Sequence, residues 1–308
     1  MLAIVGIIIS GAVMVGAGFD FSKLVTHEYV TNTYTVSEEF DSISISVKTE
    51  DIEILPSEDG ECKLVCRENV KITHTVAVVD RVLTIGIEDN RSSLIDYIGI
   101  GGAFTKSTLY LPTASYDELS VSLSTGDVKV CAGVDYKNIS VKTTTGDVEC
   151  LASSEDAIFI FTRTGDITVR DISAGVMKLV VDTGDISAHG VRCDGDISIT
   201  ADTGDTTLND VRCGNLIAET DTGDLMLKDT VADGRFDIET DTGDVTFDGA
   251  DAAEIYIETD TGDVIGSLLS DKVFIVETNT GRKDVPHTVV GGRCEISTDT
   301  GDVIISIK

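Results

Sequence analysis

The sequence predicts an all-β fold: a right-handed, single-chain β-solenoid (β-helix-like) of about ten coils, preceded by an N-terminal transmembrane helix. Three observations carry this prediction. A Thr-Gly-Asp tripeptide recurs every 19 or 20 residues, the positions around it alternate between apolar and polar residues, and the 308 residues include 29 Gly, 3 Pro and no Trp. A fixed period of this length is the signature of a repeat architecture, and parallel crossover connections are right-handed by default.

The first 19 residues contain no charged side chain and are long enough to cross a bilayer as a helix. We therefore expect residues 1–19 to be a transmembrane anchor. A signal segment cleaved near Ala17 is the alternative. With an uncleaved anchor, the chain is a single-pass protein of the cell membrane with an extracellular C-terminal domain.

Residues 20–112 are expected to form an irregular β entry and capping region. Within it, the segment from Ser42 to Ile54 alternates like the later repeats but has Glu50 where they have glycine. We interpret this segment as a degenerate coil that precedes the regular array of residues 113–308.

A glycine marks each of the ten regular repeats. We expect it to form a structural corner, because glycine tolerates positive φ and the following Asp can hydrogen-bond nearby backbone. On backbone strain alone, Gly223→Val should cost roughly 1 to 3 kcal/mol. Arg282 and Lys283 depart from the motif, so the corner before them should differ locally. The corner glycines are Gly126, Gly146, Gly165, Gly184, Gly204, Gly223, Gly243, Gly262, Gly281 and Gly301.

Apolar columns flank the glycines with the period of a strand. The positions seven and five before each glycine are apolar throughout, as in Ile197 and Ile199 before Gly204. Two positions after the glycine, eight of ten residues are apolar, the exceptions being Thr206 and Lys283. The inward-facing positions thus change parity at the glycine, as they would if the chain turned a corner and both arms faced one core.

A run of hairpins is the alternative architecture. It would place β-branched Thr in a two-residue loop that requires positive φ, where Thr fits poorly. Stacked coils about 4.8 Å apart also explain the constant period, since an extra residue would bulge from the stack. The solenoid is therefore preferred.

The composition excludes several classes of function. Lys and Arg number 23 and Asp and Glu 54, so the net charge of −31 argues against nucleic acid as a partner. No nucleophile-elbow, zinc-protease or phosphate-loop motif occurs. We expect no enzyme activity, no catalytic residue and no cofactor-binding residue.

The cysteines and histidines predict no structural zinc site. Cys62 and Cys66 lack a second pair at zinc-finger spacing, and the four histidines are scattered. Cys193 and Cys213 each lie nine residues after their glycine, so they should stack on adjacent coils. A disulfide between them is possible, but two buried free thiols are favoured.

Acidic residues line the corners in two columns. The favoured interpretation is that these aspartates cap turns on a solvated edge, so that Asp224→Asn would be nearly silent. The alternative is a row of Ca²⁺ sites, because this ion binds hard oxygen ligands. Against it, the repeats lack the paired glycines of calcium-binding β-helix motifs. The calcium candidates are Asp202, Asp205, Asp221, Asp224, Asp241, Asp244, Asp260 and Asp263.

The segments FDSISISVKTEDIEI and LYLP, followed by STGDVKV, TTGDVEC, RTGDITV, DTGDVTF and DTGDVIG, resemble the bacterial putative-adhesin β-strand-repeat family, a domain of unknown function. The resemblance covers about residues 30–308. It implies a β-solenoid ectodomain with a role at the cell surface or envelope, and it offers no catalytic residues.

The functional hypothesis is a non-enzymatic, membrane-anchored extracellular protein that acts as an adhesin or cell-surface scaffold. Its ligand would be a protein or a glycan. Two alternatives stay open: an envelope-stress accessory protein that binds a membrane partner, and a Ca²⁺-dependent binding module.

Overall fold

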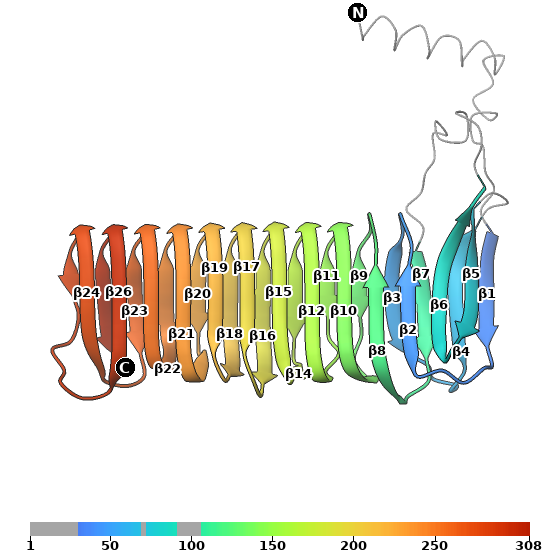
Figure 1. Cartoon of the computed structure of the whole chain (residues 1–308), viewed down its shortest axis with the longest axis horizontal. Coiled ribbons are helices and arrows are strands. Elements are labelled where there is room, and N and C mark those ends of the chain that lie inside the picture. The colour runs from blue at the N-terminus through green and yellow to red at the C-terminus, as the bar shows by residue number, and fades with distance from the viewer. Residues whose placement is uncertain (1–29, 69–71, 91–105) are drawn as a thin grey trace, which may run out of the picture.

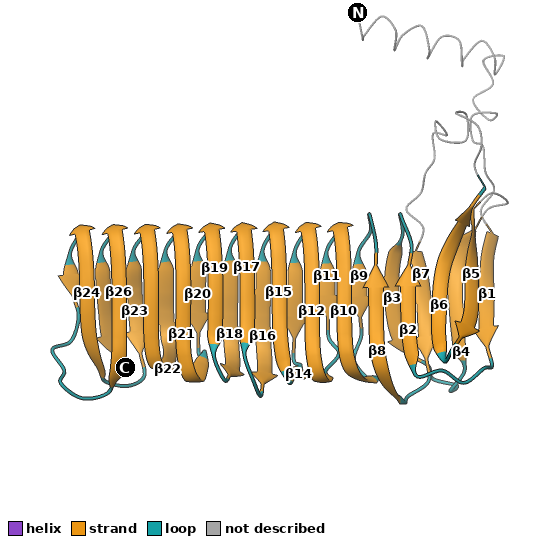
Figure 2. Cartoon of the chain, in the orientation of Figure 1, coloured by secondary structure: helices purple, strands orange, loops and turns teal. Residues whose placement is uncertain are grey.

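A computed structural model describes residues 30–68, 72–90 and 106–308, and every regular element in these ranges is a β-strand (Figure 2). The predicted anchor over residues 1–19 lies outside the described residues. Within the described residues, no helix has the length and apolar character needed to cross a membrane.

Each regular coil consists of two strands that meet at the Thr-Gly-Asp corner. In the coil of Gly204, β17 (Ile197–Thr203) precedes the corner and β18 (Thr206–Cys213) follows it. β17 pairs in parallel and in register with equivalent strands of the coils on both sides, and so does β18. Pairing between coils, rather than across the corner, confirms the solenoid over the hairpins (Figure 1). Its right-handed sense stays a prediction.

Stacking produces two long parallel arrays of strands that face each other. The array before the corner contains β8 (Ser115–Ser122), β10 (Asp135–Thr145), β12 (Ser154–Thr164), β15 (Val176–Thr183), β17, β19 (Leu216–Thr222), β21 (Val231–Thr242), the second half of β22 (Val245–Thr261), β26 (Gly292–Thr300) and β24 (Lys272–Thr280). The array after the corner contains β9 (Val128–Val130), β11 (Val148–Cys150), β13 (Ile167–Arg170), β14 (Ser173–Ala174), β16 (Ile186–Cys193), β18, β20 (Leu225–Lys228), the first half of β22, β23 (Val264–Leu268), β27 (Val303–Ile307) and β25 (Lys283–Asp284).

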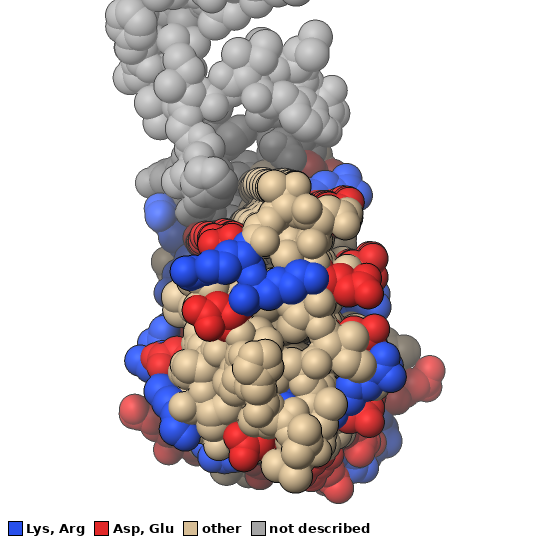
Figure 3. Space-filling view, turned by 90° about the vertical axis from the view of Figure 1, so that its left-hand side faces the viewer, with Lys and Arg blue, Asp and Glu red and all other residues tan. Residues whose placement is uncertain are grey.

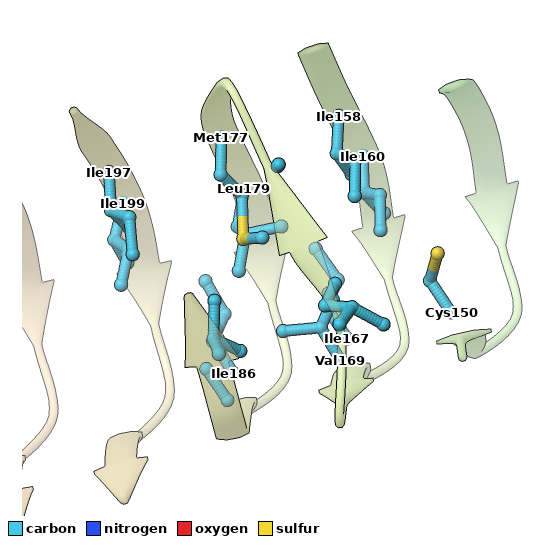
Figure 4. Close-up of a cluster of buried hydrophobic side chains, with 14 of the residues drawn as sticks. Cys150, Ile158, Ile160, Ile167, Val169, Met177, Leu179, Ile186, Ile197 and Ile199 are labelled. Atoms are coloured by element: carbon cyan, nitrogen blue, oxygen red, sulfur yellow. The ribbon is translucent and has the colours of Figure 1, made fainter. Parts of the chain in front are cut away.

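The core lies between the two arrays and contains the predicted columns. Every residue seven or five positions before a corner glycine is buried, except Phe274 and Val276 in the coil of Gly281, which are half-buried. Full burial of one such side chain contributes about 1.5 to 3 kcal/mol, so the ladders are the main stabilising feature. Figure 4 shows pairs from three adjacent coils in equivalent places in the core: Ile158 with Ile160, Met177 with Leu179, and Ile197 with Ile199.

The N-terminal end confirms the degenerate coil. The two strands on either side of Glu50 stack on β8 and β9 in the register of a regular coil. A further pair, β6 and β7, stacks on them in parallel, and antiparallel strands then close both arrays. The strands of this end are β1 (Val30–Val36), β2 (Ser42–Ser46), β3 (Asp51–Pro56), β4 (Cys62–Glu68), β5 (Ile72–Val79), β6 (Val82–Asp89) and β7 (Lys106–Leu111).

At the C-terminal end, the spatial order of the coils differs from the order in the chain. β26 pairs with β22 on one side and with β24 on the other, so the coil of Gly301 lies between those of Gly262 and Gly281. The prediction that each coil stacks on the next one in the chain therefore holds up to the coil of Gly262, and it is wrong for the last two coils. The coil of Gly281 forms the end of the rod, which Figure 3 views directly. Lys and Arg side chains cross this surface, with Asp and Glu side chains beside them and uncharged residues below.

Candidate functional site

The corner glycines are required for two separate reasons. Eight of them have φ between 136° and 158°, as predicted, and Gly262 and Gly301 do not adopt positive φ in this range. The second reason is contact between coils, which the sequence did not reveal. A Cβ on Gly223 would lie 2.0 Å from the carbonyl oxygen of Gly204 in the neighbouring coil.

At Gly262 only the second reason, close contact between coils, applies. Its φ lies outside the strained range, yet a Cβ there would lie 1.9 Å from the carbonyl oxygen of Gly243. Real Cβ atoms do not approach backbone this closely, so only glycine fits. The corners thus stack backbone against backbone along the whole array.

The aspartate after each glycine links one coil to the next. The Asp224 N–H donates to Oδ1 of Asp205 at 2.9 Å, and the Asp244 N–H donates to Oδ1 of Asp224 at the same distance. The ladder runs from Asp51, in the degenerate coil, to Asp302. The sequence correctly predicted that these carboxylates bind backbone, but their partners lie in the adjacent coil rather than in their own turn.

This ladder gives a physical reason for the reversed order of the last two coils. The N–H of Arg282 donates to Oδ1 of Asp302 at 2.8 Å, which completes the ladder. The coil of Gly281 is the last in space, so no further N–H needs a carboxylate from it. Lys283 replaces the buried apolar residue and is exposed. The coil that has Arg282 in place of aspartate therefore lies at the end of the array, where no further coil needs its carboxylate.

The ladder predicts how Asp224 responds to substitution. Asp224→Asn should change the free energy of unfolding by less than about 0.5 kcal/mol, because an amide oxygen accepts the same bond, whereas Asp224→Ala should cost about 1 kcal/mol. Urea denaturation measures both. Asp221→Ala, an exposed change in the same coil, is the control and should be silent. If Asn costs as much as Ala, the charge rather than the hydrogen bond matters.

The calcium candidates lie along this same edge, where one carboxylate oxygen of each ladder aspartate already accepts a backbone hydrogen bond. Calcium binding there stays a prediction. In the described part of the chain, the one group of three possible ligand residues with donor atoms within 4.8 Å of one another is elsewhere, at Cys66, Glu68 and His74.

That group belongs to a buried polar cluster at the N-terminal end, the Glu50–His74–Glu68 cluster. The His74 ring lies between the two carboxylates, with Nε2 2.9 Å from Glu50 Oε2 and Nδ1 2.9 Å from Glu68 Oε1. All three side chains are at most 3% exposed. A doubly protonated imidazole between two carboxylates satisfies both ring nitrogens and offsets one negative charge.

Further polar groups surround the cluster. The Ser107 hydroxyl donates to Glu50. The Tyr34 hydroxyl donates to Glu68 at 2.9 Å, and the Asn32 amide also donates to Glu68. The Cys66 thiol lies 3.7 Å from Glu68 Oε1. These contacts give the buried polar atoms at this end of the core their hydrogen-bond partners, which burial away from water requires.

The surroundings shift the pKa values of the cluster. Burial lowers the pKa of His74, but its contacts with Cys66 and Glu50 raise it more, to about 10. Burial raises the pKa of Glu68, but hydrogen bonds from Asn32 and His74 hold it below its ordinary value. Burial raises the pKa of the Cys66 thiol. These contacts favour the protonated, cationic form of His74.

Sequence reasoning missed this cluster, although a signal was present. Glu68 continues the inward-facing alternation of Cys62, Leu64 and Cys66, so it places a carboxylate in an apolar column. Glu50 likewise stands where the other coils have a glycine. An acidic residue at an inward-facing position needs a partner in the core, and that partner is His74.

Cys193 and Cys213 stack on adjacent coils, as predicted, since the preceding residues Arg192 and Arg212 pair in register. Both thiols are free and buried, and burial raises the pKa of Cys213 to about 12. They are inert core residues rather than a reactive site.

Comparison with known families supports the observed architecture. The family model described as Toastrack DUF4097 matches residues 40–201 and 194–308. No curated protein matches the chain. A crystal structure of a putative adhesin from Parabacteroides distasonis ATCC 8503 has 11% sequence identity and a TM-score of 0.50, covering 89% of this chain and 98% of that one. This similarity shows the fold.

Two further crystal structures are less similar in shape. A putative adhesin from Bacteroides fragilis NCTC 9343 has 18% identity and a TM-score of 0.46, covering 91% of this chain and 97% of that one. A putative lipid binding protein from Parabacteroides distasonis ATCC 8503 has 14% identity and a TM-score of 0.45, covering 79% of this chain and 97% of that one.

Proposed function

Because the chain belongs to the Toastrack DUF4097 family, we propose that it is a non-enzymatic cell-surface scaffold whose Thr-Gly-Asp edge binds a protein or glycan ligand. The Thr-Gly-Asp edge is the row of corners formed by the ten regular coils. Anchoring through residues 1–19 and an extracellular position for the solenoid are part of the proposal.

The observation that carries this proposal is the repetition of exposed groups along the edge. In the central coils the threonine before the glycine is exposed, as in Thr203, Thr222 and Thr242. The acidic residues Asp202, Asp221, Asp241 and Asp260, two before the glycines, are exposed as well. A ligand with a repeated structure can engage several coils at once, and such multivalency raises the overall affinity without any deep pocket.

The same geometry argues against catalysis. The repeated carboxylates form no single differentiated cleft, which an active site needs to separate acid and base roles. The combination of Ser107, His74 and Glu50 has the residue types of a hydrolase, but Ser107 is 1% exposed and the His74 side chain 2% exposed. A substrate does not reach atoms that are this deeply buried.

The test compares two triple variants of the full chain in a binding assay on glycan and protein arrays. The triple variant Asp221→Asn, Asp241→Asn and Asp260→Asn removes charge from the edge and should weaken binding about tenfold. The matched control removes the same charge from the same coils two residues earlier, on the strand face: Glu219→Gln, Glu239→Gln and Glu258→Gln. It should leave binding within about twofold.

Equal effects of the two triple variants would overturn the role of the edge. Binding that requires Ca²⁺ and is not supported by Mg²⁺ would favour the calcium-dependent module instead. In intact cells, a membrane-impermeant amine reagent should label the exposed Lys142 and Lys178. Labelling only after lysis would overturn the extracellular position, and cross-linking to a membrane protein of the same cell would favour the accessory role.

A further inference from the structure

We propose that Cys66, Glu68 and His74 bind one zinc-class divalent ion, which closes the N-terminal end of the solenoid core. The three residues supply a thiolate, a carboxylate oxygen and an imidazole nitrogen, all from side chains buried in the same place. This inference is independent of the ligand-binding function of the Thr-Gly-Asp edge.

The distances suit a small tetrahedral site. His74 Nδ1 lies 2.9 Å from Glu68 Oε1, and Cys66 Sγ lies 3.7 Å from the same oxygen. Ligand atoms around tetrahedral zinc lie roughly 3.3 to 3.6 Å apart, given bonds of about 2.0 to 2.3 Å. Both distances lie within about half an ångström of this range, and the three ligand atoms all lie within 4.8 Å of one another.

The groups around these ligands have the arrangement that metal sites use to orient them. Glu50 contacts His74 Nε2 at 2.9 Å, so it accepts the proton on that nitrogen and directs Nδ1 toward Cys66 and Glu68. A carboxylate on the far nitrogen of a histidine ligand is a common feature of zinc sites. The Ser107 hydroxyl holds Glu50 in turn, and the Tyr34 hydroxyl holds Glu68.

The site connects the two arrays where they end. Cys66 and Glu68 belong to β4, which pairs with β1 and β7 in one array. His74 belongs to β5, which pairs with β6 in the other. A repeat array needs a cap at each end, because its outermost coil has a neighbour on one side only. A metal ion bound here would cross-link the two arrays directly across the core.

The donor set indicates the class of metal. A mixture of thiolate and imidazole favours zinc and related transition metals, whereas calcium and magnesium prefer oxygen ligands alone. The sequence predicted no zinc site because Cys62 and Cys66 lack a second pair at zinc-finger spacing. Here the ligands come from strands of opposite arrays, so their separation in the sequence carries no such pattern.

Cobalt serves as a spectroscopic probe of this site. The full chain, stripped with a chelator, should bind one Co²⁺ with a sulfur-to-cobalt charge-transfer absorption, and Zn²⁺ should displace it. Cys66→Ser should abolish that absorption. The matched control is Cys62→Ser, a change at another buried cysteine four residues earlier on the same face of β4, which should retain it.

Glu50→Gln tests the contact between Glu50 and His74 Nε2, on the side of the ring away from the metal. It leaves all three ligands in place, so the charge-transfer absorption should persist while Zn²⁺ affinity falls about 10- to 100-fold. Zn²⁺ should also raise the melting temperature of the wild-type chain and of Cys62→Ser, but not of Cys66→Ser. Absence of the absorption in the wild-type chain, or its retention in Cys66→Ser, would overturn the proposal.

Discussion

Gly223→Ala is expected to destabilise the solenoid by about 3 to 6 kcal/mol, which combines backbone strain with a steric clash. The φ of 146° is unfavourable for any residue with a side chain. The new Cβ would also lie 2.0 Å from the carbonyl oxygen of Gly204, so the two coils would have to separate at their corner. This effect exceeds the value expected from strain alone.

Two control variants separate the contributions. Gly262→Ala has the contact without positive φ and should still cost about 3 kcal/mol, while the exposed Gly60→Ala has a φ of 76°, meets no atom within 4 Å, and should cost about 1 kcal/mol. Urea denaturation followed by circular dichroism gives all three values. If Gly262→Ala proves as mild as Gly60→Ala, close approach between coils is not what requires glycine.

His74→Ala is expected to cost about 3 to 5 kcal/mol in chelator-treated protein, because it leaves Glu50 and Glu68 buried without a cation. Glu50 is fully buried and Glu68 is 3% exposed, so neither carboxylate can turn to water without opening the N-terminal end. The loss should appear as a lower urea midpoint.

A second substitution makes this interpretation specific. Adding Glu68→Gln to His74→Ala should recover part of the stability, because it removes one of the two uncompensated charges. Thr75→Ala, at the neighbouring exposed position of β5, is the control and should be nearly silent. If the double variant is as unstable as the sum of the single ones, His74 contributes through packing and not through charge.

The regular part of the fold was predictable from the sequence because every coil repeats the same local interactions. Ile197 and Ile199 face inward, Gly204 turns the corner, and the Asp205 carboxylate accepts a hydrogen bond from the N–H of Asp224. These requirements recur at a fixed spacing. The degenerate coil was predictable for the same reason, since β2 and β3 keep the alternation even though Glu50 replaces glycine.

The candidate sites were less predictable because they depend on contacts between distant residues. Glu50, Glu68, His74 and Ser107 are spread over 58 positions of the chain, from 50 to 107. Glu68 and Ser107 belong to strands of one array and His74 to a strand of the other, while Glu50 lies at the corner between β2 and β3. Their proximity arises only when β5 and β6 fold back onto β2 and when β4 pairs with β7. No local pattern encodes such an arrangement.

The sequence by itself determined the repeat, its period, the corner glycines and the inward-facing columns, because these follow from the geometry of a single strand and a single turn. Only the tertiary structure decided which coil lies at the end of the rod and what closes the other end. The coil of Gly281 can occupy the C-terminal end because the N–H of its Arg282 donates to Asp302, the last acceptor of the ladder. No further coil stacks on it, so it needs no carboxylate of its own at this position. Whether a coil needs the aspartate depends on whether another coil stacks on it, and this is decided only when the coils are assembled.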